Sequence, residues 1–148
     1  MLREMAPERT ILALERLVLH GGTLTSRVLQ SHPETSGLSV SQYRLFVLVT
    51  TGDNLHVGEL ARRLGASSQT TTRLVQRLEA RGLVTSARGT ADRRMVIVRP
   101  TPRAVELWRV ISDQRRASFR DALAGLTIDD ESLAALEQLA DGFARATH

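Results

Sequence analysis

Residues 59–83, ELARRLGASSQTTTRLVQRLEARGL, hold two helical patterns separated by a two-residue turn. The first pattern, 59–64, stops at Gly65, because glycine readily adopts the left-handed conformation that ends a helix. Ser67 is placed to cap the second helix, predicted over 68–81, and Gly82 to end it. The apolar residues of this second helix lie on one side, and its polar residues lie largely on the other, namely Gln69, Thr72, Arg73, Gln76 and Arg77.

A hairpin follows directly. Residues 83–87 and 95–98 are two short β-prone runs, and the polar segment between them carries three arginines. Two helices joined by a tight turn and followed at once by a hairpin are the sequence form of a winged helix-turn-helix. The fold class predicted is therefore mainly α with a small β-wing.

Apolar stripes mark long helices at both ends of the chain. Residues 8–31 are apolar on more than one side, which predicts a helix with two neighbours, and Gly21-Gly22 predicts a kink or close packing there. A capping box at Ser39 and Gln42 starts a short buried helix that ends near Gly52. Thr101-Pro102 starts a helix that continues to about 124, and Thr127 with Asp130 is predicted to cap the last one. A lone winged domain does not need these end helices, and their apolar faces require a partner surface. We therefore expect a homodimer.

The composition of the chain excludes some classes of function and favours others. The 148 residues contain no cysteine, which excludes disulfides and thiolate chemistry. No signal peptide or membrane span is evident, so we expect a cytoplasmic protein. Residues 55–100 hold nine arginines against three acids, which is typical of polyanion binding. We find no nucleophile–base pair, phosphate loop or metal motif, and we expect neither an enzyme nor a cofactor.

The chain resembles the MarR family of regulators. The similarity is densest in ELARRLG (59–65), TRLVQRLEARGLV (72–84), DRR (92–94) and VIVRPT (96–101), and the flanking helices agree in order and length. His56 departs from the pattern, because members often place a hydroxyl residue there as a helix cap. The resemblance implies one MarR-like domain over 1–148, with dimerisation helices at 8–37 and 101–148 and a winged helix-turn-helix at 39–100.

The resemblance also implies a site for double-stranded DNA. The helix from Ser68 should lie in the major groove, with Gln69 and Arg73 as the main base readers and Arg77 on a phosphate. Arg94 would enter the minor groove, held by a salt bridge to Asp92. The alternatives are an ordinary solvated helix face and a plain hairpin turn. Arg62, Arg63 and Arg81 are expected to be solvated or to steer phosphates. The candidate DNA-binding residues are Ser67, Ser68, Gln69, Thr72, Arg73, Arg77, Arg88, Asp92, Arg93 and Arg94.

The family often responds to small aromatic or anionic effectors bound between the dimer helices and the winged domain. Arg16, His20, Tyr43 and Trp108 would line such a cleft, although each also fits an ordinary core or surface role. The histidines lack the tight spacing of a metal site, so structural roles are favoured for them. The function predicted is a repressor that binds two half-sites about one helical turn apart as a homodimer and is relieved by an effector. A winged-helix module that binds proteins without specific DNA binding is the alternative.

Overall fold

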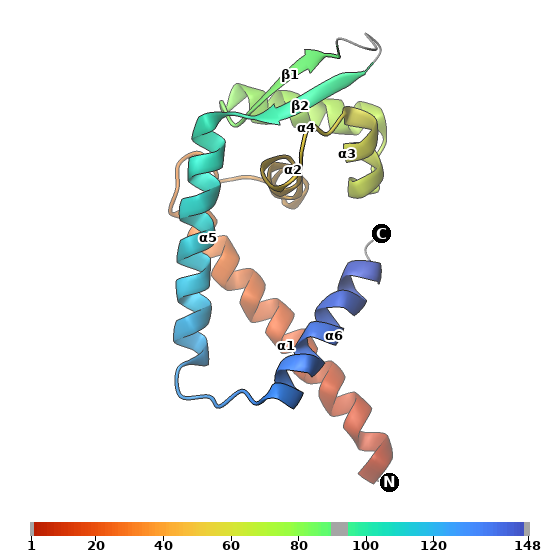
Figure 1. Cartoon of the computed structure of the whole chain (residues 1–148), viewed down its shortest axis with the longest axis vertical. Coiled ribbons are helices and arrows are strands. Elements are labelled where there is room, and N and C mark those ends of the chain that lie inside the picture. The colour runs from red at the N-terminus through yellow and green to blue at the C-terminus, as the bar shows by residue number, and fades with distance from the viewer. Residues whose placement is uncertain (1, 90–94, 147–148) are drawn as a thin grey trace. The chain divides into compact units, whose positions relative to one another are not determined.

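The computed structural model describes residues 2–89 and 95–146, and within them it confirms a mainly helical fold with a two-stranded antiparallel wing (Figure 1). The chain divides into two compact units, Met1–Ser118 and Phe119–His148. No helix in the described ranges is long and apolar enough to cross a membrane. The elements are α1 (Leu2–Gln30), α2 (Val40–Thr51), α3 (Val57–Leu64), α4 (Ser68–Ala80), β1 (Val84–Arg88), β2 (Val96–Pro100), α5 (Pro102–Leu123) and α6 (Asp130–Ala146).

The core of the first unit is built around α2. Its residues Leu45 and Phe46 are fully buried, and α2 contacts α3, α4 and β2. Leu60 from α3 and Leu78 from α4 are also fully buried in the same cluster. Burial of this kind stabilises a domain through the removal of apolar surface from water, and it fixes α4 by its apolar side. The polar side of α4 is thereby left facing outward.

The turn between α3 and α4 is set by local chemistry, as the sequence predicts. Gly65 takes the left-handed conformation with φ of 63°. The Ser67 hydroxyl caps α4 by accepting a hydrogen bond from the Thr70 amide at 3.1 Å. Gly82 is left-handed as well, with φ of 69°, and follows the end of α4. These features end α3, start α4 and end α4 before the chain continues into the wing.

The wing is a hairpin whose base is joined to the start of α3. Its register pairs Val84 with Pro100 and Arg88 with Val96. Beyond the hairpin, the amide of Val98 donates to the carbonyl of Leu55 at 2.9 Å, and His56 forms a β-bridge with Ile97. The position of the wing is therefore coupled to the start of the helix-turn-helix.

Two of the predicted helix starts are wrong. The last helix begins at Asp130, and its cap is Asp129 rather than Thr127, because the Asp129 carboxylate accepts the Ser132 amide at 2.8 Å. A carboxylate at this position also suits the positive end of the helix. The short helix α3 begins at Val57 instead of residue 59, because the side chain of His56 acts as its cap.

The glycine pair in α1 does not end the helix. α1 continues through Gly21 and Gly22 to Gln30. A side-chain carbon added at either glycine would meet no other atom within 4 Å in the described structure. The predicted close packing at these glycines is therefore not found among the described residues.

We expect Ser39→Ala to lower the free energy of unfolding by about 1 kcal/mol. Ser39 and Gln42 form the predicted capping box: the hydroxyl accepts the Gln42 amide at 3.3 Å, and the Gln42 side chain accepts the Ser39 amide at 2.8 Å. Removing the hydroxyl leaves one amide of α2 without this partner. Urea denaturation measures the loss, and Ser41→Ala, an exposed change on the same helix, serves as the control. Equal stability of the two variants would contradict the prediction.

Candidate nucleic-acid interface

α4 has one buried side and one exposed side. Thr71, Leu74, Val75 and Leu78 are at most 8% exposed. The candidate DNA-binding residues on α4 and at its cap are all exposed, namely Ser67, Ser68, Gln69, Thr72, Arg73 and Arg77. A helix fixed by one side and polar on the other is suited to binding a ligand along its length.

Some exposed side chains at α4 form hydrogen bonds within the chain, and others do not. The Ser67 hydroxyl serves the helix cap, and the Thr72 hydroxyl donates to the Ser68 carbonyl at 2.8 Å. Gln69, Arg73 and Arg77 form no hydrogen bond or ion pair with other described residues. These three side chains are therefore available to an external partner.

Neighbouring arginines are engaged within the chain. Arg62 and Arg63 both pair with Glu59, at 2.8 and 2.6 Å, and they hold the pKa of its carboxyl at about 2. Arg81 donates to the carbonyls of Glu34 and Ser36 at 3.1 and 2.9 Å. Arg81 is therefore not simply solvated, because its guanidinium holds the loop between α1 and α2. Its role in steering phosphates stays a prediction.

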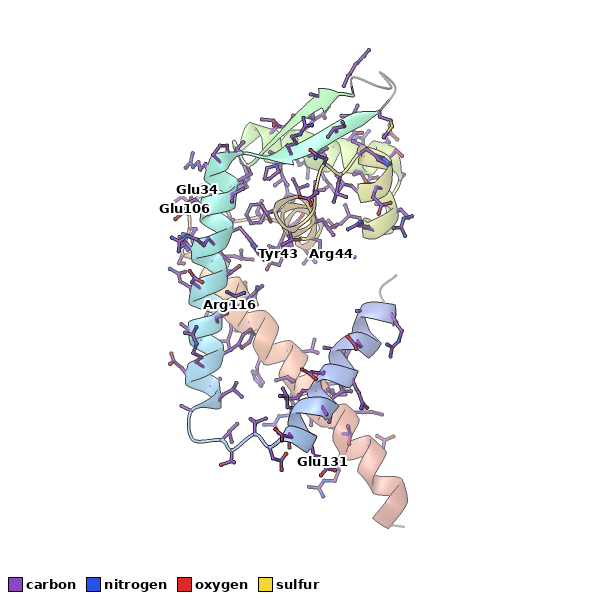
Figure 2. The ribbon with its side chains drawn as sticks, viewed as in Figure 1. Glu34, Tyr43, Arg44, Glu106, Arg116 and Glu131 are labelled. Atoms are coloured by element: carbon purple, nitrogen blue, oxygen red, sulfur yellow. The ribbon has the colours of Figure 1, made fainter. Side chains whose placement is uncertain are left out.

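That loop is also held from α5. Glu34, labelled in Figure 2, lies beside α5. It pairs with Arg103 near the start of that helix, and this contact lowers the pKa of the Glu34 carboxyl below its usual range. The loop is thus connected both to the end of α4 and to α5.

The wing supplies one described candidate residue. Arg88 is exposed at the end of β1 and forms no ion pair with other described residues. The other three wing candidates, Asp92, Arg93 and Arg94, lie outside the described residues, and their assignments stay predictions. Arg73, Arg77 and Arg88 are candidate residues of this surface whose positive charge is not paired with a described acidic side chain.

The four candidate effector residues fall into two groups. Tyr43 on α2 (Figure 2) and Trp108 on α5 are joined by Arg115, which donates to the Tyr43 hydroxyl at 3.2 Å and lies 5.3 Å from the centre of the Trp108 ring. Arg16 and His20 are exposed on α1 and have no contact with this group among the interactions of the described residues. Sequence reasoning missed Arg115, although it lies seven residues after Trp108, about two turns along one face of a helix.

Two histidines take structural roles. The Nε2 atom of His32 lies 3.0 Å from the side-chain oxygen of Gln114, and Nδ1 of His56 accepts the Glu59 amide at 3.1 Å. Within residues 2–89 and 95–146, no three histidine, aspartate or glutamate side chains gather as a metal site would require. His56 therefore replaces the hydroxyl cap that the sequence comparison led us to expect.

A helix-turn-helix with a free polar face, followed by a wing, defines the winged helix-turn-helix class. Residues 36–95 match the sequence model of the MarR family. The transcriptional regulator YfiV of Bacillus subtilis is 31% identical over 116 residues, which cover 77% of this chain and 72% of YfiV. The chain belongs to the MarR family.

Solved structures share the fold. RV1404 from Mycobacterium tuberculosis has a TM-score of 0.78 at 18% identity, covering 94% of this chain and 92% of that one. FabT of Streptococcus pneumoniae, solved in complex with DNA, has a TM-score of 0.66 at 16% identity, covering 98% and 96% of the two chains. At such identities the likeness extends to the fold alone.

Proposed function

We propose that this protein is a sequence-specific regulator that binds double-stranded DNA as a homodimer and represses transcription from a palindromic operator in the bacterial cytoplasm. The observation that carries the proposal is the free polar face of α4. Gln69, Arg73 and Arg77 are exposed and have no partner among the described residues. FabT, which shares this fold, was solved in complex with DNA, and this supports DNA binding as the role of the fold here.

Residue roles follow from position on α4. Gln69 and Arg73 are in the first half of the helix, where side chains of a recognition helix contact base edges. Arginine pairs with guanine and glutamine with adenine through two hydrogen bonds each. Arg77, one turn after Arg73, contacts a phosphate. The wing contacts the flanking groove and the DNA backbone through Arg88, Asp92, Arg93 and Arg94.

Exposed apolar side chains support a homodimer. Leu17 and Val18 on α1 are each 60% exposed. On α6, Leu133 is 48% exposed and Phe143 is 51% exposed. Apolar stripes of this extent indicate a protein interface, because they would otherwise remain in contact with water. A second copy of the chain covers them with a symmetric surface and places two copies of α4 on two half-sites.

Repression is relieved when an effector changes the spacing of the two recognition helices. The proposed ligand is a small aromatic or anionic molecule, because Tyr43, Trp108 and Arg115 combine aromatic rings with a cation. Arg16 and His20 belong to the same proposed set. The loop contacts of Glu34 and Arg81 connect α5 to the end of α4, which gives the ligand a physical route to the DNA-binding helix.

Fluorescence anisotropy tests the proposal. The purified protein is titrated against the DNA upstream of its own gene and against a scrambled duplex over a series of salt concentrations. We expect tighter binding to the upstream duplex and a steep loss of affinity with salt. In a reporter strain, deletion of the gene should raise transcription from that promoter. Absence of binding even at low salt would refute DNA binding and favour the protein-interaction module.

A further inference from the structure

A hollow of about 390 Å³ lies beside the exposed face of α4. Three segments of the first unit line it: the start of α3, the first half of α4 and the start of β2, at the tip end of the wing. No acidic side chain is among the described residues of its wall. The lining residues are His56, Val57, Gly58, Ser68, Thr72, Met95 and Val96.

The imidazole of His56 is fixed in the wall of this hollow. Its Nδ1 atom accepts the Glu59 amide at 3.1 Å, so the neutral ring must carry its proton on Nε2. The backbone of His56 is held by its bridge to Ile97 of the wing. A side-chain carbon at Gly58 would lie 3.2 Å from Nδ1, so glycine leaves the ring the room it occupies.

Two hydrogen-bond donors in the wall of the hollow have no partner among the described residues. Neither the Nε2–H group of His56 nor the Ser68 hydroxyl is bonded to another described side chain or backbone group. The Thr72 hydroxyl, in contrast, donates to the Ser68 carbonyl. Unused donors in a wall whose described residues include no carboxylate suit a group that only accepts hydrogen bonds, and phosphate is such a group.

The hollow also flanks the proposed base-reading positions. Gln69 and Arg73 follow Ser68 and Thr72 by one residue, which places them about 100° further round the helix. When Gln69 and Arg73 face the base edges of the major groove, Ser68 and Thr72 face one side of that groove. The sides of the groove are formed by the sugar-phosphate backbones.

We propose that this hollow seats one backbone phosphate of the bound DNA and that His56 donates its Nε2–H to it. The inference rests on the proposed function and deepens it. His56 is then a positioning residue with two uses: Nδ1 caps α3, while Nε2–H fixes the register of α4 along the groove. Because the ring is neutral, its contact adds affinity without the release of a counterion.

The variant His56→Ser separates the two uses. Serine keeps a capping oxygen for α3 but lacks the Nε2–H group. We expect the melting temperature of the variant to stay close to that of the wild type. Its affinity should fall about tenfold per protomer, as for the loss of a hydrogen bond to a charged group, and equally for the upstream and the scrambled duplex. The slope of log affinity against log salt should not change, because a neutral donor displaces no cation.

A second variant and a spectroscopic readout complete the test. His56→Ala should lose the same affinity and, in addition, thermal stability, because the cap is gone. The ¹⁵N resonance of Nε2 should shift on addition of duplex but not on addition of inorganic phosphate at the same phosphate concentration.

Several outcomes would overturn the inference. If the wild-type protein binds duplex and His56→Ser binds it with the same affinity, His56 is only a helix cap. The proposed function would then stay intact. A change in salt slope would show that His56 acts as a cation. A resonance that responds to inorganic phosphate but not to duplex would assign the hollow to a free anion. A wild-type chain that binds neither duplex would overturn the inference and the proposed function together.

Discussion

Replacing Arg73 with alanine is expected to weaken binding to the operator duplex by about 30-fold or more while changing affinity for a scrambled duplex far less. Arg73 is exposed on α4 and has no ion pair among the described residues. A two-hydrogen-bond contact from arginine to guanine contributes about 1–3 kcal/mol of discrimination. The dimer makes this contact twice, and about 1.4 kcal/mol corresponds to a factor of ten. Anisotropy titrations against both duplexes measure the loss.

Two further arginine variants act as controls. Arg77→Ala removes a proposed phosphate contact, so it should weaken both duplexes alike and reduce the salt slope by about 2, one for each protomer. Arg109→Ala should change neither affinity, because Arg109 is exposed on α5 and pairs with Glu106 at 2.7 Å. If Arg73→Ala weakened both duplexes equally, Arg73 would be a phosphate contact instead of a base reader.

The helix-turn-helix could be predicted because its signals are local. Gly65 ends α3, Ser67 caps α4 and Gly82 follows α4 in the left-handed conformation, as the residue types require. The polar and apolar sides of α4 follow from the period of 3.6 residues. The exposure of the candidate residues on α4 could therefore be deduced before the structure was known.

Features that depend on tertiary contacts or on unusual caps could not be predicted. Arg81 has the same residue type as Arg77, and only the fold shows that it binds the carbonyls of Glu34 and Ser36. Histidine is an uncommon cap, so the residue type at position 56 did not show that α3 begins at Val57, although the family resemblance places a cap there. The contact of Arg115 with Tyr43 joins residues 72 positions apart, a distance that no local pattern spans.

Leu133→Glu combined with Leu136→Glu is expected to convert the dimer into a monomer. Both side chains are on the apolar face of α6, 48% and 45% exposed in the single chain, so glutamate is tolerated in the isolated protomer. In the dimer the same positions would bury four unpaired carboxylates, and burying an unpaired charge costs several kcal/mol. Sedimentation velocity measures the change in mass, and far-UV circular dichroism should show unchanged helix content.

The monomer should then bind the operator at least 100-fold more weakly, because linking two half-site contacts in one molecule raises affinity by about 10² to 10⁴. Gln138→Glu is the control: it adds one negative charge per protomer, where the double variant adds two, on the opposite side of α6, about 200° from Leu136, and it should leave both mass and affinity unchanged. A monomeric variant that kept the wild-type operator affinity would refute the mechanism of two half-sites, since one copy of α4 would then be sufficient. A variant that stayed dimeric would instead place the subunit interface on other apolar residues, such as Leu17 and Val18 on α1, which are 60% exposed each.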